Sequence, residues 1–287
     1  MEYYKNKLIL ITGGSSGIGL SLAKQLAEQE ANVWILARRP EQLAVAIKEI
    51  EACRKNPNQK IGFIEADVTN EQEINTKLTK FIDQNGVPDI LINSAGATRP
   101  GLFEELGSDI FRFMMEVNYF GSVYTMKQIV PGMIARHSGH LINISSAAGY
   151  KGVYGYTAYS GSKFAIFGLT DTLRSELKEY GIRVSVVMPP DTNTPQHAGE
   201  LPYQPPLTKA LNENGGLAQP DDVARQILSS AAKGKYLIIC NFQTKLLYNI
   251  INILSVFNLW NPFMDMLVEQ ARRKAQKRGE LQLEAKK

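Results

Sequence analysis

Short apolar runs alternate with amphipathic stretches along most of the chain. The apolar runs lie at Leu8–Ile11, Val33–Leu36, Ile61–Glu65, Ile90–Ile92, His140–Ile144, Arg183–Val187 and Tyr236–Cys240. Between them, hydrophobic residues recur at helical spacing over about 15–30, 41–54, 71–84, 109–136, 159–180 and 220–232. Strands that alternate with helices imply right-handed βαβ units and a parallel sheet covered on both faces. The pattern therefore predicts an α/β fold over residues 1–240, with a doubly wound, Rossmann-type parallel sheet in three αβα layers.

Residues 189–216 interrupt this alternation. They contain six prolines and end in a Gly-Gly pair, a composition typical of a loop. A loop of this length inside a compact domain is usually functional or mobile, so the sequence predicts a mobile lid over an apolar groove. Leu201, Tyr203 and Leu207 are the candidate residues that line this groove, and ordinary loop packing is the alternative.

A second change of pattern comes near the end of the chain. Leu246–Trp260 is apolar except for a polar residue at every third position, which on a helix leaves about half of the surface apolar. It contains no uninterrupted run of about 20 apolar residues, which argues against a bilayer span. We expect 241–287 to be an amphipathic helical extension that contacts a membrane surface through residues 246–278, with Tyr248 and Trp260 as interfacial anchors. Packing on the body of the protein and a subunit interface are the alternatives.

The charge distribution adds to this picture. The 287 residues carry a formal net charge of +4, but the last 17 of them hold seven Lys or Arg and two Glu. The body of the protein therefore gives no reason to expect nucleic acid as a partner, whereas the tail suits anionic lipid. The basic cluster in the tail consists of Arg272, Arg273, Lys274, Lys277 and Arg278.

Cysteine usage and the N-terminus restrict the compartment. Cys53 and Cys240 are the only cysteines, which argues against a disulfide framework or a metal cluster. Met1–Lys7 is polar and lacks the pattern of a secretory signal peptide. We therefore expect a cytoplasmic protein without a metal, associated peripherally with a membrane.

A glycine-rich segment connects the first predicted strand to the first helix. Glycines permit positive φ and the close approach of a ligand, and a pyrophosphate can then meet the free N–H groups of the helix N-terminus. In this strand-turn-helix position the segment predicts a dinucleotide site, and a tight turn without a ligand is the alternative. The candidate contacts are Gly13, Ser15, Ser16, Gly17, Ile18 and Gly19.

Two further positions bear on the cofactor. The second predicted strand is followed by Arg38 and Arg39, where an acidic residue would bind the ribose hydroxyls of NAD. Two arginines suit a 2′-phosphate, so we expect NADPH, with a solvated basic turn as the alternative. Asp67 and Val68 end the third strand, where the carboxylate can reach the adenine edge or, equally, cap the helix that starts near Asn70.

Tyr159 and Lys163 lie four residues apart at the start of the helix predicted over 159–180. At this spacing they share a helix face, and the cation favours the phenolate, so we expect the pKa of the tyrosine to be lowered from its reference value of about 10. A phenol beside an ammonium group can transfer a proton. Taken alone, however, such a pair is more often two surface neighbours.

Several motifs together resemble those of the short-chain dehydrogenase/reductase family over about residues 5–240. They are the glycine-rich segment 12–19, Asn93-Ser94-Ala95-Gly96, Asn118, Ser145-Ser146 and Tyr159…Lys163, in the order and spacing of the family. The resemblance implies that Tyr159 donates a proton to a substrate carbonyl, and that Lys163 lowers the Tyr159 pKa and binds the nicotinamide ribose. It also implies that Ser146 holds the substrate oxygen and that Asn118 positions a water linking Lys163 to solvent. The spacing of thirteen residues to Tyr159 favours Ser146 over its neighbour Ser145.

The resemblance assigns the remaining motif residues to the cofactor as well. Asn93 and Gly96 are expected on the adenosine side of the site. Pro189 begins a Pro-Pro pair where the family usually has Pro-Gly, which puts the local backbone in question but not the role of the segment. Thr192 and Thr194 are both candidates to contact the nicotinamide carboxamide.

The motif Pro-Pro-Asp-Thr-Asn-Thr-Pro over 189–195 further resembles the 3-ketodihydrosphingosine reductases, a branch of this family. That resemblance implies the NADPH-dependent reduction of a long-chain 3-keto amino alcohol. The alternatives are another lipid-like ketone, such as a 3-ketoacyl chain, a steroid or a fatty aldehyde, and a non-catalytic, membrane-tethered nucleotide-binding protein. The family also implies a possible homo-oligomer through the helices at 109–136 and 159–180.

Overall fold

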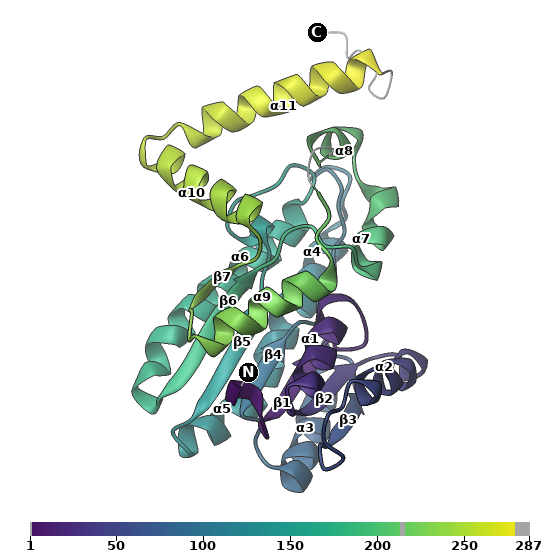
Figure 1. The fold of residues 1–287 in the computed structure, drawn as a ribbon. Coiled ribbons are helices and arrows are strands. Elements are labelled where there is room, and N and C mark those ends of the chain that lie inside the picture. The colour runs from purple at the N-terminus through teal and green to yellow at the C-terminus, as the bar shows by residue number, and fades with distance from the viewer. Residues whose placement is uncertain (1, 213–215, 279–287) are drawn as a thin grey trace.

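A computed structural model describes residues 2–212 and 216–278 of the chain. A seven-stranded parallel sheet in the order β3-β2-β1-β4-β5-β6-β7 forms its centre, and helices cover both faces (Figure 1). This confirms the predicted doubly wound α/β fold. The strands are β1 (Leu8–Thr12), β2 (Asn32–Ala37), β3 (Ile61–Glu65), β4 (Ile90–Asn93), β5 (Gly139–Ile144), β6 (Ile182–Met188) and β7 (Leu237–Ile239).

Two apolar layers hold the helices against the sheet. The first layer lies under α1 (Gly17–Glu28), α2 (Pro40–Ala52) and α9 (Pro220–Ala232), and the second under α3 (Glu71–Asn85), α5 (Gly121–Ala135) and α6 (Thr157–Glu176). Ile9 and Ile11 of β1 belong to the first layer and Leu10 to the second, because successive side chains of a strand point to opposite faces. This double burial explains why the strands are continuously apolar.

The strand order reverses between β1 and β4. Thr12 and Asn93 are register partners at the carboxyl ends of these two strands. The helices that follow the two strands lie on opposite faces of the sheet, which leaves a crevice at this end. Ligands of doubly wound proteins bind in this crevice.

The helix predicted over 109–136 consists of three consecutive pieces. α4 (Ser108–Met115) is joined to α5 by a π-helical turn at Glu116–Phe120. Such turns widen a helix locally and occur frequently at functional sites. Asn118 lies in the turn and is buried, with 1% of its surface exposed.

The loop predicted over 189–216 is largely helical, so that prediction is wrong for most of the segment. It contains α7 (Pro195–Glu200), a 3-10 turn at Leu201–Tyr203 and α8 (Pro206–Asn212). Pro195 and Pro206 each begin a helix, where a missing N–H costs no hydrogen bond. Two of the six prolines that indicated a loop are therefore helix starts. Residues 213–215, which include the first glycine of the Gly-Gly pair, lie outside the described residues.

The C-terminal arm, defined here as residues 242–277, consists of α10 (Phe242–Val256) and α11 (Trp260–Lys277). It leaves the sheet after β7, and α11 passes over α8 (Figure 1). Ala271 and Ala275 of α11 are buried against Leu207 and Ala210 of α8. Leu207 therefore packs against the C-terminal arm. The prediction that it lines a groove is wrong.

One side of α10 contacts the body of the protein. The ring centroids of Tyr248 and Tyr150 are 4.5 Å apart, and the Tyr150 hydroxyl donates a hydrogen bond to Asn252. The Lys151 ammonium lies 5.8 Å from the Trp260 ring centroid. Packing on the body, the first alternative to membrane contact, thus occurs along this side and involves both predicted anchors.

Two further predictions for the C-terminal region concern a bilayer span and the extent of the helical extension. Within residues 2–212 and 216–278, no helix combines the length and the apolar character that crossing a membrane requires. The end of the predicted extension, residues 279–287, lies outside the described residues.

Candidate active site

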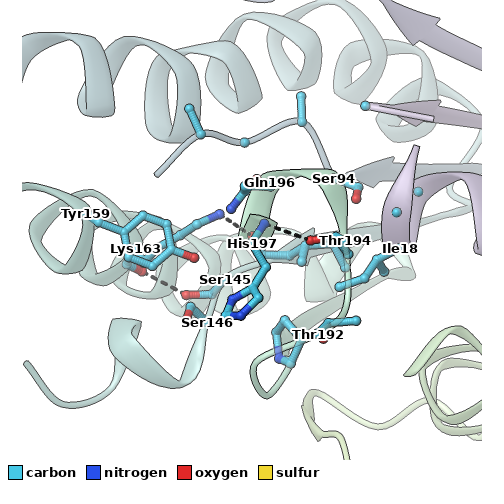
Figure 2. Close-up of a pocket in the computed structure, with 18 of the residues that line it drawn as sticks. Ile18, Ser94, Ser145, Ser146, Tyr159, Lys163, Thr192, Thr194, Gln196 and His197 are labelled. Atoms are coloured by element: carbon cyan, nitrogen blue, oxygen red, sulfur yellow. Dashed lines mark hydrogen bonds between the residues drawn. The ribbon is translucent and has the colours of Figure 1, made fainter. Parts of the chain in front are cut away.

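A cavity of about 500 Å³ lies at the carboxyl ends of the central strands. Figure 2 shows Tyr159 and Lys163 on one side of it and Ile18 and Ser94 on the other. The cavity brings together nearly all of the residues predicted from the sequence, from the glycine-rich segment through Arg38, Arg39, Asp67 and Val68 to Pro189. Asn93 and Asn118 are the predicted site residues that lie behind its wall.

The glycine-rich segment forms a cradle that side chains would block. Gly13 has a φ of +69°, and a Cβ added to it would lie 2.7 Å from the Ala95 Cα atom. A Cβ on Gly19 would lie 2.3 Å from the Gly13 carbonyl oxygen. The Ser16 side chain does not cap α1, so the first N–H groups of this helix stay free for a ligand at the cavity wall. The cradle fits the pyrophosphate of a dinucleotide.

Arg38 and Asp67 approach each other across the ends of β2 and β3. Their closest side-chain N and O atoms are 3.4 Å apart. Partial burial acts to raise the pKa of the Asp67 carboxyl, but hydrogen bonds from Thr69 and the charge of Arg38 outweigh it and hold this pKa below its usual range. Asn70, rather than Asp67, accepts the capping hydrogen bond at the start of α3. The capping alternative for Asp67 is therefore wrong, and its carboxylate lines the cavity.

Tyr159 and Lys163 lie on the first two turns of α6, and both line the cavity. The Lys163 ammonium donates a hydrogen bond of 3.0 Å to the Ile144 carbonyl at the end of β5. It lies 5.8 Å from the centroid of the Tyr159 ring. The carboxyl end of β5 thus fixes the lysine beside the tyrosine.

The electrostatics of this pair differ from the expectation. Burial raises the pKa of the Tyr159 phenol, and the hydrogen bond with Ser146 opposes this without reversing it. Burial also lowers the pKa of Lys163 to about 8. The expected lowering of the Tyr159 pKa is therefore not found, because desolvation of the phenolate raises this pKa and the negative charges of Glu200 and Asp191 add to the effect. Tyr159 keeps its proton at neutral pH, as a proton donor must.

The two adjacent serines face different partners. The Ser145 hydroxyl is buried and donates a hydrogen bond of 2.9 Å to the backbone carbonyl of Lys163. Ser146 lies beside Tyr159, and its hydroxyl accepts a hydrogen bond from the Ala148 N–H. The geometry favours Ser146 as the group that meets a substrate oxygen, with Ser145 joining β5 to α6.

Asn118 is fully engaged by its neighbours. Its side chain accepts from the Ala97 N–H and donates to the Ala97 carbonyl and to the Ser162 hydroxyl, at 2.8 to 3.0 Å. A Cβ added to Gly96 would lie 3.1 Å from its side-chain oxygen. These contacts connect the segment that follows β4 to α6, next to Lys163. The water relay implied for Asn118 stays a prediction.

Asn93 requires a correction. It was expected to contact the cofactor, but its amide donates to Asn143 of β5 and accepts from Thr125 of α5. With 2% of its surface exposed, it does not line the cavity. A buried amide needs all of its hydrogen bonds satisfied within the protein, and here they connect the two central strands to α5.

The two candidate threonines also differ. The Thr192 hydroxyl is buried and donates to the Pro190 carbonyl at 2.7 Å. The Thr194 hydroxyl caps α7 by accepting from the His197 N–H, and its methyl group faces Gly17 of the cradle. Both residues line the cavity, and Thr194 brings α7 next to the glycine-rich segment (Figure 2).

Sequence reasoning missed one wall of the cavity. Gln196, His197 and Glu200 of α7 line it, as do Thr244 and Leu247 of α10. The signal for α7 was present, since Thr194 followed by Pro195 is a typical cap and first residue of a helix. The approach of α10 depends on tertiary packing and has no local signal.

Comparison with known proteins bears on this geometry. The family model described as short chain dehydrogenase matches residues 7–202 of the chain. The 3-dehydrosphinganine reductase of Danio rerio is 39% identical over 229 residues, which cover 79% of this chain and 69% of the relative. The 3-ketodihydrosphingosine reductase of Dictyostelium discoideum is 38% identical over 256 residues, or 84% and 77% of the two chains.

Solved structures show the same similarity in three dimensions. A crystal structure of an actinorhodin polyketide ketoreductase variant with NADPH superposes with a TM-score of 0.72 at 28% identity, and covers 82% of this chain and 95% of its own. A short-chain dehydrogenase from Streptomyces avermitilis gives a TM-score of 0.75 at 25% identity, with coverages of 91% and 98%. The shared architecture extends over most of the described residues.

Proposed function

Because this chain belongs to the short-chain dehydrogenase family, and is thus an oxidoreductase, we propose that it reduces the 3-keto group of 3-ketodihydrosphingosine to give dihydrosphingosine, with NADPH as the reductant. The observation that carries the proposal is a proton-donor site formed by Tyr159, Ser146 and Lys163 in a chain whose named relatives are reductases of this ketone. Each part of the proposal rests on a different set of residues.

Side chains of this protein bind and protonate the carbonyl oxygen of the substrate. NADPH, when bound in the glycine cradle, supplies a hydride to the carbonyl carbon. The Ser146 hydroxyl holds the carbonyl oxygen, and the Tyr159 phenol gives its proton to that oxygen as negative charge develops there. A phenol with a raised pKa keeps this proton until a strongly basic alkoxide forms. The positive charge of Lys163 favours the phenolate that remains.

The choice of NADPH rests on Arg38 and Arg39. Both line the cavity where β2 ends, the position at which an acidic residue would select NAD. Asp67 pairs with Arg38 and orients its guanidinium, which can bind a 2′-phosphate through two parallel hydrogen bonds. A structural neighbour was solved with NADPH, which is consistent with this preference.

The membrane part of the proposal rests on the exposed face of α10. Ile253 is 60% exposed, Val256 77% and Phe257, directly after the helix, 66%, whereas polar Asn252 of the helix contacts Tyr150 of the body. A helix that only packs on a protein in water would not expose such a set of large apolar side chains. Exposed apolar patches of this kind are typical of membrane or protein contacts. The basic cluster 272–278 on the neighbouring helix favours an anionic lipid surface, on which the protein would lie peripherally at the cytoplasmic side.

A rival within the same family is the reduction of a 3-ketoacyl or polyketide chain. The similarity to a polyketide ketoreductase favours it. The test is NADPH oxidation with 3-ketodihydrosphingosine and with a 3-ketoacyl thioester, each presented in mixed micelles at matched mole fraction. We expect a kcat/KM for the sphingoid ketone at least about tenfold higher, a difference that polar groups in a binding pocket readily supply. Equal or better turnover of the thioester would overturn the substrate assignment.

A further inference from the structure

Glu200 is the last residue of α7 and forms part of the cavity wall that holds Tyr159 and Ser146. Its surface is 8% exposed. A buried carboxylate in an active-site cavity is costly unless a cation or several hydrogen bonds compensate for its lost hydration. The groups that contact the Glu200 carboxylate therefore indicate its function.

The protein satisfies one oxygen of this carboxylate. The Tyr156 hydroxyl donates to Oε1 at 2.9 Å, and the Gln204 amide donates to the same atom at 3.3 Å. The His197 Nδ1 atom lies 3.3 Å from Oε1 as well. Within residues 2–212 and 216–278, no Lys or Arg pairs with Glu200, and all of these contacts fall on Oε1. The second oxygen, Oε2, keeps its capacity to accept hydrogen bonds.

Glu200 also lies close to the reacting groups. The Tyr156 ring, whose hydroxyl contacts Glu200, packs edge-on against the Tyr159 ring with centroids 6.0 Å apart. The Glu200 charge is one of the causes that raise the pKa of the Tyr159 phenol, after burial. A negative charge thus acts on the position where the ketone oxygen would be protonated.

The proposed substrate carries a matching charge. In 3-ketodihydrosphingosine an ammonium group stands on the carbon next to the ketone carbon, so a carboxylate close to the proton donor can meet it. Building on the proposed function, we infer that Glu200 binds the ammonium group of the substrate through Oε2 and so selects 2-amino ketones over neutral ketones. The hydrogen bonds from Tyr156 and Gln204 orient the carboxylate for this contact.

The test compares two substrates on three proteins. The substrates are 3-ketodihydrosphingosine and its analogue without the amino group, 1-hydroxyoctadecan-3-one, both in mixed micelles. The proteins are the wild type, Glu200→Gln, which keeps an acceptor for Tyr156, and Asp191→Asn, which neutralises an exposed carboxylate on the same cavity wall. We expect Glu200→Gln to lower kcat/KM for the amino ketone about 10- to 100-fold, the range for a lost charge-assisted hydrogen bond, and to change it within about twofold for the analogue. Asp191→Asn should leave the ratio between the two substrates unchanged.

The outcomes separate this inference from the proposed function. A wild type that does not reduce the amino ketone overturns both. If the wild type prefers the amino ketone, two results overturn only the role of Glu200. In the first, Glu200→Gln keeps the preference, and in the second, Asp191→Asn loses it. Equal losses on both substrates would mean that Glu200 supports the structure, which also overturns the inference.

A measurement on the wild type covers the case in which Glu200→Gln does not fold. Dihydrosphingosine and octadecane-1,3-diol differ in the amino group alone and can serve as competitive inhibitors. We expect the amine to inhibit at about tenfold lower mole fraction, because only the amine can pair with the carboxylate. Equal inhibition would overturn the inference.

Discussion

The active-site crevice and the C-terminal arm place polar and apolar side chains in opposite ways. In the crevice, Asn118 and Ser145 are buried and bonded to the backbone of neighbouring segments. In the arm, Ile253 and Val256 are exposed and Asn252 contacts the body. The polar groups of the crevice are thus engaged by hydrogen bonds within the chain, whereas the arm exposes large apolar side chains. The comparison predicts that changes in the crevice alter chemistry and changes in the arm alter where the chemistry occurs.

The largest effect is expected for Tyr159→Phe. Removal of the hydroxyl eliminates the proton donor, so kcat should fall by about 10³-fold, within the range for loss of general acid catalysis. The measurement is NADPH oxidation with the sphingoid ketone. Cofactor fluorescence serves as the control, because NADPH binding should persist. A kcat within tenfold of the wild type would remove Tyr159 from the mechanism.

The neighbouring serines allow a matched comparison inside the crevice. Ser146→Ala should lower kcat/KM about 10²-fold, as expected for a lost hydrogen bond to a developing oxyanion. Ser145→Ala should instead lower the free energy of unfolding by about 1–2 kcal/mol, because the Lys163 carbonyl loses its buried donor. Initial rates and urea unfolding curves of both variants check this. If Ser145→Ala had the larger kinetic effect, the assignment of the two serines would be reversed.

The arm is tested by a change on its exposed face. Ile253→Asp should weaken binding to vesicles that contain anionic lipid by about tenfold or more, since burial of such a side chain stabilises by about 1.5–3 kcal/mol. Flotation measures the effect, and Asn249→Asp is the control, because Asn249 is an exposed polar residue of the same helix. Turnover of a short-chain ketone in solution should stay unchanged in both variants.

Two results would contradict the membrane part of the proposal. Equal flotation of the wild type and Ile253→Asp would mean that this face does not contact lipid. A shift from dimer to monomer in Ile253→Asp, measured by sedimentation, would identify a second copy as the group that covers it. The homo-oligomer through α5 and α6 stays a separate prediction.

The smallest effect is the pH dependence contributed by Lys163. Burial lowers the pKa of this lysine to about 8, so its charge is present below about pH 8 and lost above it. The charge favours the phenolate left on Tyr159, so kcat for reduction should decline severalfold as the pH rises through this value. Rates measured between about pH 6 and 10 check this. A flat profile would mean that Lys163 does not titrate in this range.

The sequence predicted the sheet well because its central strands are buried on both faces. Leu8–Thr12 is an example, since its apolar residues fill two layers and leave no alternative local pattern. The motif residues around the cavity were predicted for a related reason. The glycine cradle and the Tyr159–Lys163 pair act through short-range geometry, which spacing in the chain expresses directly.

The remaining features depend on partners that are distant in the sequence. Asn93 was assigned to the cofactor, but its hydrogen bonds go to Asn143 and Thr125. The raised pKa of Tyr159 follows from desolvation of the phenol by its surroundings, which spacing to Lys163 does not reveal. The position of Glu200 depends on a helix that proline content had hidden, because proline is equally suited to a loop and to a first helical position.

The contact of α10 with the cavity has a consequence for how such proteins diverge. Thr244 and Leu247 line the same space as the glycine cradle, while the next turns of the helix expose Ile250 and Ile253. The boundary near residue 240 therefore divides the chain without dividing the site. A recombination at this boundary would exchange part of the substrate wall together with the outward-facing surface.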